Sequence, residues 1–230
     1  MCRGGTGIRI CHVCYNDSMN EGNNRTNIIW TAGFAYGIGL ITSDGNLSKD
    51  GRHISFKSAE LELINNFKNA FGIDNRIGRS ARGGEIEKRY YYTQFSNVRL
   101  YAYLNTIGLT SGKSKTIKKV EVPKKYFHDF LRGVFDGDGT FYTFWDRRWI
   151  QSFGFQISFA SASLDFIVWL KDTLHQLFGV KGFIRVGDGV YNLRYVKRDT
   201  RVLFGQMYRN ENCKLFLKRK YDKMKDAFNL

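Results

Sequence analysis

Hydrophobic and polar positions along the chain repeat one pattern twice. Apolar residues recur at the three-to-four-residue spacing of a helix over about 30–44 and 59–71, and again over about 126–138 and 162–178. Two strand-like segments follow each of these helices, and a further helix closes each copy. The chain is therefore predicted to have the element order αββαββα twice, which is an α+β fold with two related half-domains and a pseudo-two-fold axis.

The strand segments indicate which face of each sheet is covered. The segment 153–159 alternates, with aromatic or aliphatic residues on one face and Gly154, Gln156 and Ser158 on the other. The first copy keeps the same phase, because Ile54 and Phe56 alternate with Ser55 and Lys57. Such alternation is typical of an antiparallel sheet that helices cover on one side only. We expect two such sheets, whose outer faces form a saddle.

An internal repeat fixes the boundaries of the two halves. Residues 54–59 (ISFKSA) match residues 157–162 (ISFASA) at five of six positions, 103 residues later. Two apolar runs that end in Asp-Gly, at 39–45 and 133–139, lie only 94 residues apart, so the second copy is expected to have the longer hairpin. We predict an N-terminal arm at 1–27, a first half at 28–109, a linker at 110–125 with six lysines and Pro123, and a second half at 126–230.

Charge narrows the class of partner. The 230 residues include 36 Lys and Arg against 21 Asp and Glu, which gives a net charge of +15. This charge favours a polyanion such as nucleic acid, although a merely soluble basic protein would also show it. The most apolar stretch, 28–41, is shorter than the ~20 residues that span a bilayer, and no secretory signal opens the chain. We expect an intracellular protein that does not enter a membrane.

The four cysteines do not indicate a disulfide framework. Cys11 and Cys14 have the spacing of half a zinc knuckle, but no second pair of ligands follows them. Free thiols are expected, and the arm that contains them has no assigned role.

Small residues near the end of the first helix of each copy predict a close helix pair. Gly39 and Ser43 in the first copy correspond to Gly133 and Gly137 in the second. Residues four apart share one face of a helix, so each helix offers a nearly bare stripe to a partner backbone. We expect the two helices to pack side by side in parallel. Gly45 and Gly139 are expected to end them in the left-handed conformation, which places Asp44 and Asp138 in the last turn.

A carboxylate at a helix C-terminus is repelled by the helix dipole, so local stability gives no reason to place one there twice. Two carboxylates brought close together are stable when a hard cation such as Mg²⁺ lies between them. With a phosphodiester substrate, metal held there could activate water and stabilise the leaving oxygen. The alternative is that Asp44 and Asp138 are only helix-capping residues beside glycines.

The segments 35–47 and 130–141 resemble the paired signature helices of the LAGLIDADG homing endonucleases. The resemblance extends over about Trp30 to Ala227 and implies that family's fold. It also implies that Asp44 and Asp138, the last acidic residue of each motif, are catalytic and coordinate Mg²⁺ or another divalent cation. Asp136 lies off the metal in this motif.

The resemblance implies further residues near the site. A lysine that supports the transition state follows each closing helix, and Lys113 and Lys220 are the favoured positions, with Lys218 as the next choice. These lysines could instead be phosphate-steering or solvated side chains. A polar family position after the second strand falls on Glu60 and Ser163, and because the two copies differ there, unequal cutting of the two DNA strands is expected.

These features together predict a metal-dependent, site-specific DNA endonuclease that spreads an intron or a free-standing gene. We expect a monomer bound to double-stranded DNA, contacted by outward-facing strand residues: Lys57, Gln156, Ser158, Arg185, Asn192 and Arg194. Strands of about ten residues at ~3.3 Å each would cover about ten base pairs per half, or about 20 in total, on an asymmetric site. The alternative is a non-cutting nucleic-acid-binding protein on the same fold, either an RNA maturase or a transcriptional regulator.

Overall fold

The structure is a computed structural model that describes residues 28–81, 86–145, 152–209 and 214–228. The predicted N-terminal arm, with Cys11 and Cys14, lies outside the described residues. The first half consists of α1 (Ala32–Ser43), β1 (Gly45–Leu47), β2 (His53–Ser58), α2 (Leu61–Phe71), β3 (Gly78–Ser80), β4 (Tyr90–Ser96) and α3 (Val98–Thr106). Two short 3-10 turns follow, η1 (Lys113–Lys115) and η2 (Lys124–Tyr126).

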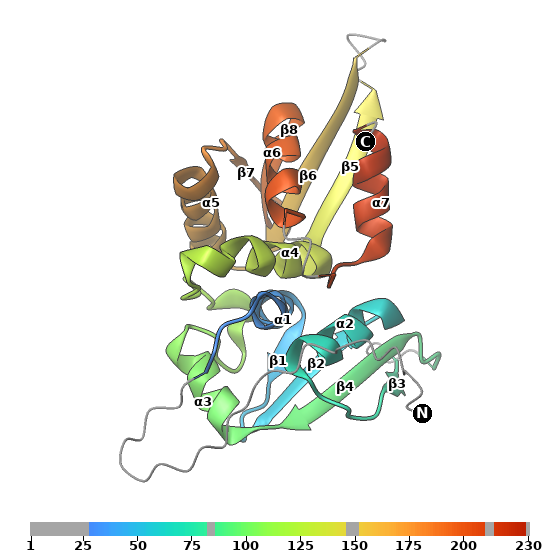
Figure 1. The fold of residues 1–230 in the computed structure, drawn as a ribbon, viewed down its shortest axis with the longest axis vertical. Coiled ribbons are helices and arrows are strands. Elements are labelled where there is room, and N and C mark those ends of the chain that lie inside the picture. Colours follow the sequence, from blue (N-terminus) through green and yellow to red (C-terminus); the bar gives the residue numbers. More distant parts are fainter. Residues whose placement is uncertain (1–27, 82–85, 146–151, 210–213, 229–230) are drawn as a thin grey trace, which may run out of the picture.

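The second half repeats this order (Figure 1). It consists of α4 (Phe127–Asp138), β5 (Gly139–Trp145), β6 (Phe153–Ser161), α5 (Leu164–Phe178), β7 (Phe183–Val186), β8 (Tyr191–Val196) and α6 (Lys197–Met207). A helix that the sequence pattern did not predict, α7 (Lys218–Ala227), follows the repeat.

In the part of the chain that the structure describes, the strands form two antiparallel four-stranded sheets of the same topology. The strand orders are β1-β2-β4-β3 and β5-β6-β8-β7. The repeat found in the sequence lies in equivalent places, because β2 and β6 are the second strand of each sheet and Ile54 and Ile157 are both fully buried. The predicted α+β fold with two αββαββα halves is confirmed.

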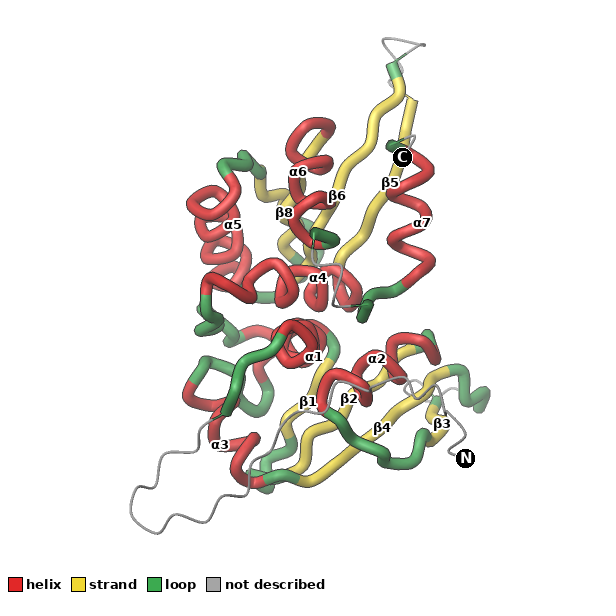
Figure 2. The backbone as a smooth tube through the Cα atoms, viewed as in Figure 1, coloured by secondary structure: helices red, strands yellow, loops and turns green. Residues whose placement is uncertain are grey.

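The strands are shorter than the predicted ten residues. β1 and β3 have three residues each, and the longest strand, β6, has nine. The prediction that the second half has the longer hairpin is confirmed, since β5 and β6 pair from Gly139–Phe159 out to Trp145–Phe153. Figure 2 shows this hairpin extending past α6 and α7.

Helices α1 and α4 lie between the two halves and touch backbone to backbone. A Cβ atom added to Gly39 would come within 2.2 Å of the Phe130 carbonyl oxygen, and one on Gly133 within 2.1 Å of the Tyr36 carbonyl oxygen. The predicted small-residue contact is therefore present. The two helices run in the same sense, since Gly133 contacts Tyr36 and Gly137 contacts Ser43. They do not lie side by side as predicted: Figure 1 shows α1 end-on and α4 from the side, so their axes cross. Glycines at the crossing point leave no side chains that would force the axes apart.

The left-handed backbone conformation predicted for the two glycines that follow the helices, Gly45 and Gly139, is also wrong. Gly139 has an extended backbone, with φ −77° and ψ 147°, and neither it nor Gly45 is among the described residues with a positive φ. These glycines instead allow the chain to pass close to the last turn of the preceding helix. A Cβ on Gly45 would lie 2.5 Å from the Ile41 Cα, and one on Gly139 would lie 2.3 Å from the Phe135 ring. The chain can therefore turn straight from the helix into the strand.

One apolar core runs through both halves and the helix pair. Ile38, Leu40 and Ile41 of α1 are fully buried, as are Phe130 and Phe135 of α4. Among the described residues, none of the helices combines the length and the apolarity that a membrane span would need.

The helix crossing yields a stability prediction. Gly133→Ala is expected to destabilise the fold by at least about 3 kcal/mol, because the new methyl group meets the α1 backbone, which cannot move aside cheaply. Gly205→Ala is the matched control, since Gly205 lies within α6 with open space around it and alanine favours a helix by about 1 kcal/mol. Chemical denaturation of both variants tests this, and equal stability would contradict the close crossing.

Candidate active site

Asp44 and Asp138 end the two crossing helices on the same side of the crossing. Asp44 is the C-cap of α1, where its N–H donates to the Leu40 carbonyl oxygen (3.1 Å), and Asp138 is the last residue of α4. The preceding residues touch, because a Cβ on Gly137 would lie 1.9 Å from the Ser43 Oγ and 3.4 Å from an Asp44 carboxylate oxygen. The helix crossing thus brings the two predicted aspartates together.

Both aspartates are open to solvent at the surface, yet many protein atoms surround each carboxyl group. This partial desolvation raises the pKa of Asp44. Desolvation and the nearby negative charge of Asp44 together raise the pKa of Asp138 to about 6. The charges of Lys113 and Lys220 oppose both shifts.

Lys113 lies at the end of α1. Its side chain is buried, and its Nζ donates a hydrogen bond to the carbonyl oxygen of Gly45 (2.7 Å), the residue after Asp44. Burial lowers the pKa of Lys113 to about 8, with the charges of Asp138 and Asp44 acting against that shift. The ammonium is therefore held beside the aspartate pair.

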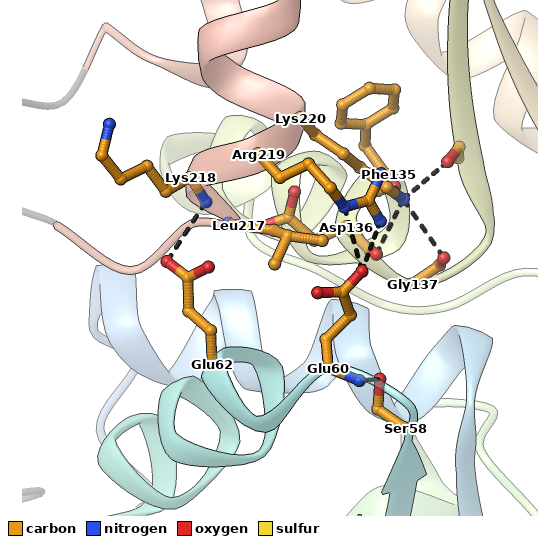
Figure 3. Close-up of polar contacts among 11 residues, drawn as sticks. Ser58, Glu60, Glu62, Phe135, Asp136, Gly137, Leu217, Lys218, Arg219 and Lys220 are labelled. Carbon is orange, nitrogen blue, oxygen red and sulfur yellow. Dashed lines mark hydrogen bonds and ion pairs between the residues drawn. The ribbon is translucent and has the colours of Figure 1, made fainter. Parts of the chain in front are cut away.

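Lys220 takes the equivalent place at the end of α4. Its Nζ donates to the carbonyl oxygens of Phe135 (2.7 Å), Asp136 (2.8 Å) and Gly137 (3.3 Å), which Figure 3 labels. It also donates to the carbonyl oxygen of Gly139 (2.6 Å). A cation at this position compensates the negative end of the helix dipole. Burial lowers the pKa of Lys220 to about 8, and Asp136, Asp44 and Asp138 act in the opposite direction. The structure thus brings Lys113 and Lys220 to the two aspartates.

Lys218 does not join this group. Its side chain is 70% exposed and pairs with Asp222 one turn along α7 (2.5 Å). Its backbone N–H donates to Glu62 (3.2 Å).

Glu60 and Ser163 occupy equivalent N-cap positions at the starts of α2 and α5. Ser163 caps α5 by accepting from the Phe166 N–H (3.3 Å), and its hydroxyl donates to the Ile117 carbonyl oxygen. The Glu60 side chain does not cap α2. It accepts from Nε (2.9 Å) and Nη2 (2.7 Å) of Arg219 instead. The two halves differ here in partner as well as in residue.

The sequence profile of the LAGLIDADG-like domain matches residues 34–108 and 128–207, which is more than half of the chain and once per half. The chain belongs to the LAGLIDADG family. A comparison with curated protein sequences finds no match.

Solved structures with the LAGLIDADG fold are similar over most of the chain. I-SmaMI bound to uncleavable DNA has a TM-score of 0.56 at 13% identity, covering 85% of this chain and 89% of its own. I-DmoI in complex with DNA and Ca has a TM-score of 0.53 at 17% identity, covering 84% and 98%. The N-terminal LAGLIDADG domain of DUF199/WhiA has a TM-score of 0.53 at 14% identity, covering 80% and 86%. At these identities the likeness shows the fold alone.

The donor chemistry of this LAGLIDADG site suits a hard divalent cation. Carboxylate oxygens are the side-chain ligands that Mg²⁺ prefers, and Mg²⁺ sites often combine one or two carboxylates with phosphate oxygens of the substrate. Among the described residues, no group of three or more His, Cys, Asp or Glu side chains could hold a metal ion. A cation at this site would have the carboxylates of Asp44 and Asp138 as its nearby side-chain ligands. Their repulsion, seen in the raised pKa of Asp138, is what a bound cation would relieve.

Sequence reasoning missed a buried polar network behind the LAGLIDADG helices. Asp136 is 1% exposed and accepts from the hydroxyl of Tyr36 (2.8 Å) and the N–H of Leu217 (2.8 Å). Arg132 is fully enclosed and donates to Asp129 (2.7 Å) and to the Leu215 carbonyl oxygen (2.8 Å). The signal in the sequence was the run of charged residues within an otherwise apolar helix, at 129, 132 and 136.

The register of the sheets places the predicted DNA-contact residues on the face away from the core. Ser158 pairs with Arg194, and Arg185 pairs with Asn192, all on the side opposite the buried Ile157 and Leu193. Lys57 is exposed on the equivalent face of the first sheet and donates to the Ala81 carbonyl oxygen (2.8 Å).

Two of these residues are more enclosed than expected. Gln156 is 6% exposed and Ser158 5%, because β6 is an inner strand whose neighbours β5 and β8 place larger side chains on either side. The Ser158 Oγ and the Arg194 Nε are buried without a hydrogen-bond partner among the described residues.

The raised pKa of Asp138 predicts a pH-dependent stability difference. A carboxyl group with a folded-state pKa near 6 binds its proton more tightly in the folded chain than in the unfolded chain, so its charged form destabilises the fold above pH 6. Asp138→Asn removes this charge. In metal-free buffer the variant should be more stable than the original chain at pH 8, and the difference should shrink as the pH falls from about 6 toward 4.

Denaturant unfolding at pH 8 and pH 4.5 in the presence of a chelator measures this effect. Asp188→Asn, in the exposed β7–β8 turn, is the control for loss of one negative charge. A pH-independent difference for Asp138→Asn would contradict the raised pKa.

Proposed function

We propose that the protein is a site-specific, metal-dependent endonuclease that cuts both strands of DNA. One observation carries the proposal: two carboxylates, Asp44 and Asp138, meet at the ends of crossing LAGLIDADG helices, each with a buried lysine beside it. Structural scaffolding alone gives no reason for this arrangement, since each aspartate lies at the unfavourable end of a helix dipole.

In this proposal the chain's own residues hold and polarise the scissile phosphates. Asp44 and Asp138 would hold the divalent cation, which supplies water activation and stabilises the leaving oxygen. Lys113 and Lys220 place positive charge where negative charge develops on the phosphate. Their pKa near 8 keeps most of each lysine protonated at pH 7.

The outer faces of the two sheets are proposed to bind the DNA. The net charge of +15 favours the polyanion, and the face that carries Lys57, Arg185, Asn192 and Arg194 offers donors for base edges and phosphates. Ser158 and Gln156 lie on the same face but are buried between larger neighbouring side chains. DNA would reach them only in the gaps between those side chains. Because the two sheets differ in strand length and side chains, one chain would bind one asymmetric site, whose length no longer follows from ten-residue strands, since the longest strand has nine residues.

A second candidate is a non-cutting nucleic-acid-binding protein on this fold, an RNA maturase or a transcriptional regulator. The fold alone does not separate the two functions, since the similar structures include the N-terminal LAGLIDADG domain of DUF199/WhiA as well as I-SmaMI and I-DmoI in complex with DNA. The retention of both aspartates and both lysines favours the endonuclease.

Cleavage selection on a randomised DNA library in Mg²⁺ distinguishes the two functions. Recovery of one long, non-palindromic sequence with a defined double-strand cut would support the endonuclease. Retention of a specific sequence without cutting would show the binding protein instead.

The aspartates yield the first functional prediction. Asp44→Asn and Asp138→Asn keep the side-chain shape but remove a charged metal ligand, so each should abolish double-strand cutting while DNA affinity in Ca²⁺ changes by less than about tenfold, or ~1.4 kcal/mol. Cleavage and filter-binding assays on the selected site measure both. Normal cutting by either variant would refute the assignment.

The two lysines yield the second functional prediction. Lys113→Met and Lys220→Met should each reduce the single-turnover cleavage rate by about 100-fold or more while weakening DNA binding far less, because a charge that acts on the transition state affects rate. A loss of affinity as large as the loss of rate would make them phosphate contacts only.

A further inference from the structure

The two lysines are held from the opposite half of the molecule. Lys220 belongs to the second half, but the residues just before it contact α2 of the first half. Arg219 pairs with Glu60, and the Lys218 N–H donates to Glu62 (3.2 Å), as Figure 3 shows. Asn66 of the same helix donates to the Phe216 carbonyl oxygen (2.9 Å).

Lys113 has the mirror arrangement. It follows the first half, but α5 of the second half holds the segment after it. Ser163 donates to the carbonyl oxygen of Ile117, whose N–H donates in turn to the Lys113 carbonyl oxygen (2.8 Å). Asp165 reaches Lys118 (3.7 Å). Since Ser163 and Asp165 are the repeat equivalents of Glu60 and Glu62, the same two positions make the cross-half contacts in both directions.

The first of these contacts has a local cost. Glu60 occupies the N-cap position of α2 but makes no capping hydrogen bond, and a helix without a side-chain cap is less stable. The ion pair it forms instead is exposed, with side-chain exposures of 60% for Arg219 and 38% for Glu60, and such pairs add little stability. Glutamate is not a favoured N-cap residue, so local stability does not explain why a glutamate that pairs with Arg219 stands at this position.

We propose that Glu60 and Ser163 are positioning residues, each of which fixes the lysine beside the opposite half's aspartate-bearing helix end. The inference rests on the proposed endonuclease function and deepens it. Glu60 acts through Arg219 on Lys220, and Ser163 acts through Ile117 on Lys113. Each strand's cleavage then depends on a residue from the other half.

Strand-resolved cleavage tests the proposal. Lys113→Met and Lys220→Met first identify which strand each lysine serves. Glu60→Ala should then slow the Lys220 strand about tenfold and leave the other strand nearly unchanged, because a small displacement of a charge from its working position costs rate. Ser163→Ala should slow the Lys113 strand. The double variant Glu60→Arg with Arg219→Glu, which restores the ion pair in reverse, should recover most of the lost rate.

Matched controls separate positioning from general destabilisation. Glu121→Ala breaks an exposed ion pair in the linker (Lys119–Glu121, 2.6 Å), and Asn97→Ala removes the cap of α3. Neither should bias the two strands. If Ser163→Ala does not fold, Asp165→Ala tests the neighbouring contact to Lys118, which holds the same segment. Ser163→Thr, which keeps the hydroxyl, should retain the rate.

Hydrogen exchange gives a readout that does not depend on cutting. In Glu60→Ala the amides of residues 217–220 should exchange about tenfold faster, with α6 unchanged. If the original chain cuts no DNA, the proposed function fails, while the exchange result still shows whether Glu60 holds this segment. Unchanged exchange, or cutting in which Glu60→Ala slows both strands equally or neither, would overturn the inference.

Discussion

The backbone contact between Gly39 and Gly133 is the constraint on which the rest of the structure depends. Any Cβ at either position would overlap the other helix's backbone, so only glycine allows α1 and α4 to cross this closely. The crossing fixes where the helices end relative to one another, and therefore where Asp44 and Asp138 meet. The core of each half and the active site share this single contact surface, so a change that separates the helices would disturb folding and chemistry together.

The electrostatics of the site follow from that proximity. Desolvation raises the pKa of both aspartates and lowers the pKa of both lysines, which moves all four groups toward neutrality. Backbone carbonyl groups at the helix ends offset part of this cost on the lysine side, with four accepting from Lys220 and one from Lys113. In the part of the chain that the structure describes, no hydrogen bond offsets the desolvation of the two aspartates, and only the charges of Lys113 and Lys220 act against it, so the site is suited to a cation.

Features set by local pattern could be predicted from the sequence, and features set by tertiary contact could not. The alternation in β6 and the small-residue stripes are patterns among near neighbours in the chain. The 103-residue repeat is a comparison of two such local patterns. The αL assignment of Gly45 and Gly139 failed because glycine serves both positive φ and close approach, and the sequence does not separate these uses. The burial of Gln156 and the partner of Glu60 depend on β5, β8 and α7, which come from elsewhere in the chain. No short sequence pattern predicts contacts between segments that lie far apart in the chain.

The two halves share one topology but are chemically unequal, and this inequality has a physical origin. Both halves lie on one chain, so each position of the repeat can change without its counterpart. The hairpin is longer in the second half than in the first, and the equivalent caps are an acid in one half and a hydroxyl in the other. The helix crossing has no such difference, because Gly39 and Gly133 each meet the backbone of the other helix. Symmetry is therefore kept where the backbones touch and is lost toward the outer faces of the sheets, where the proposed DNA site need not be symmetric.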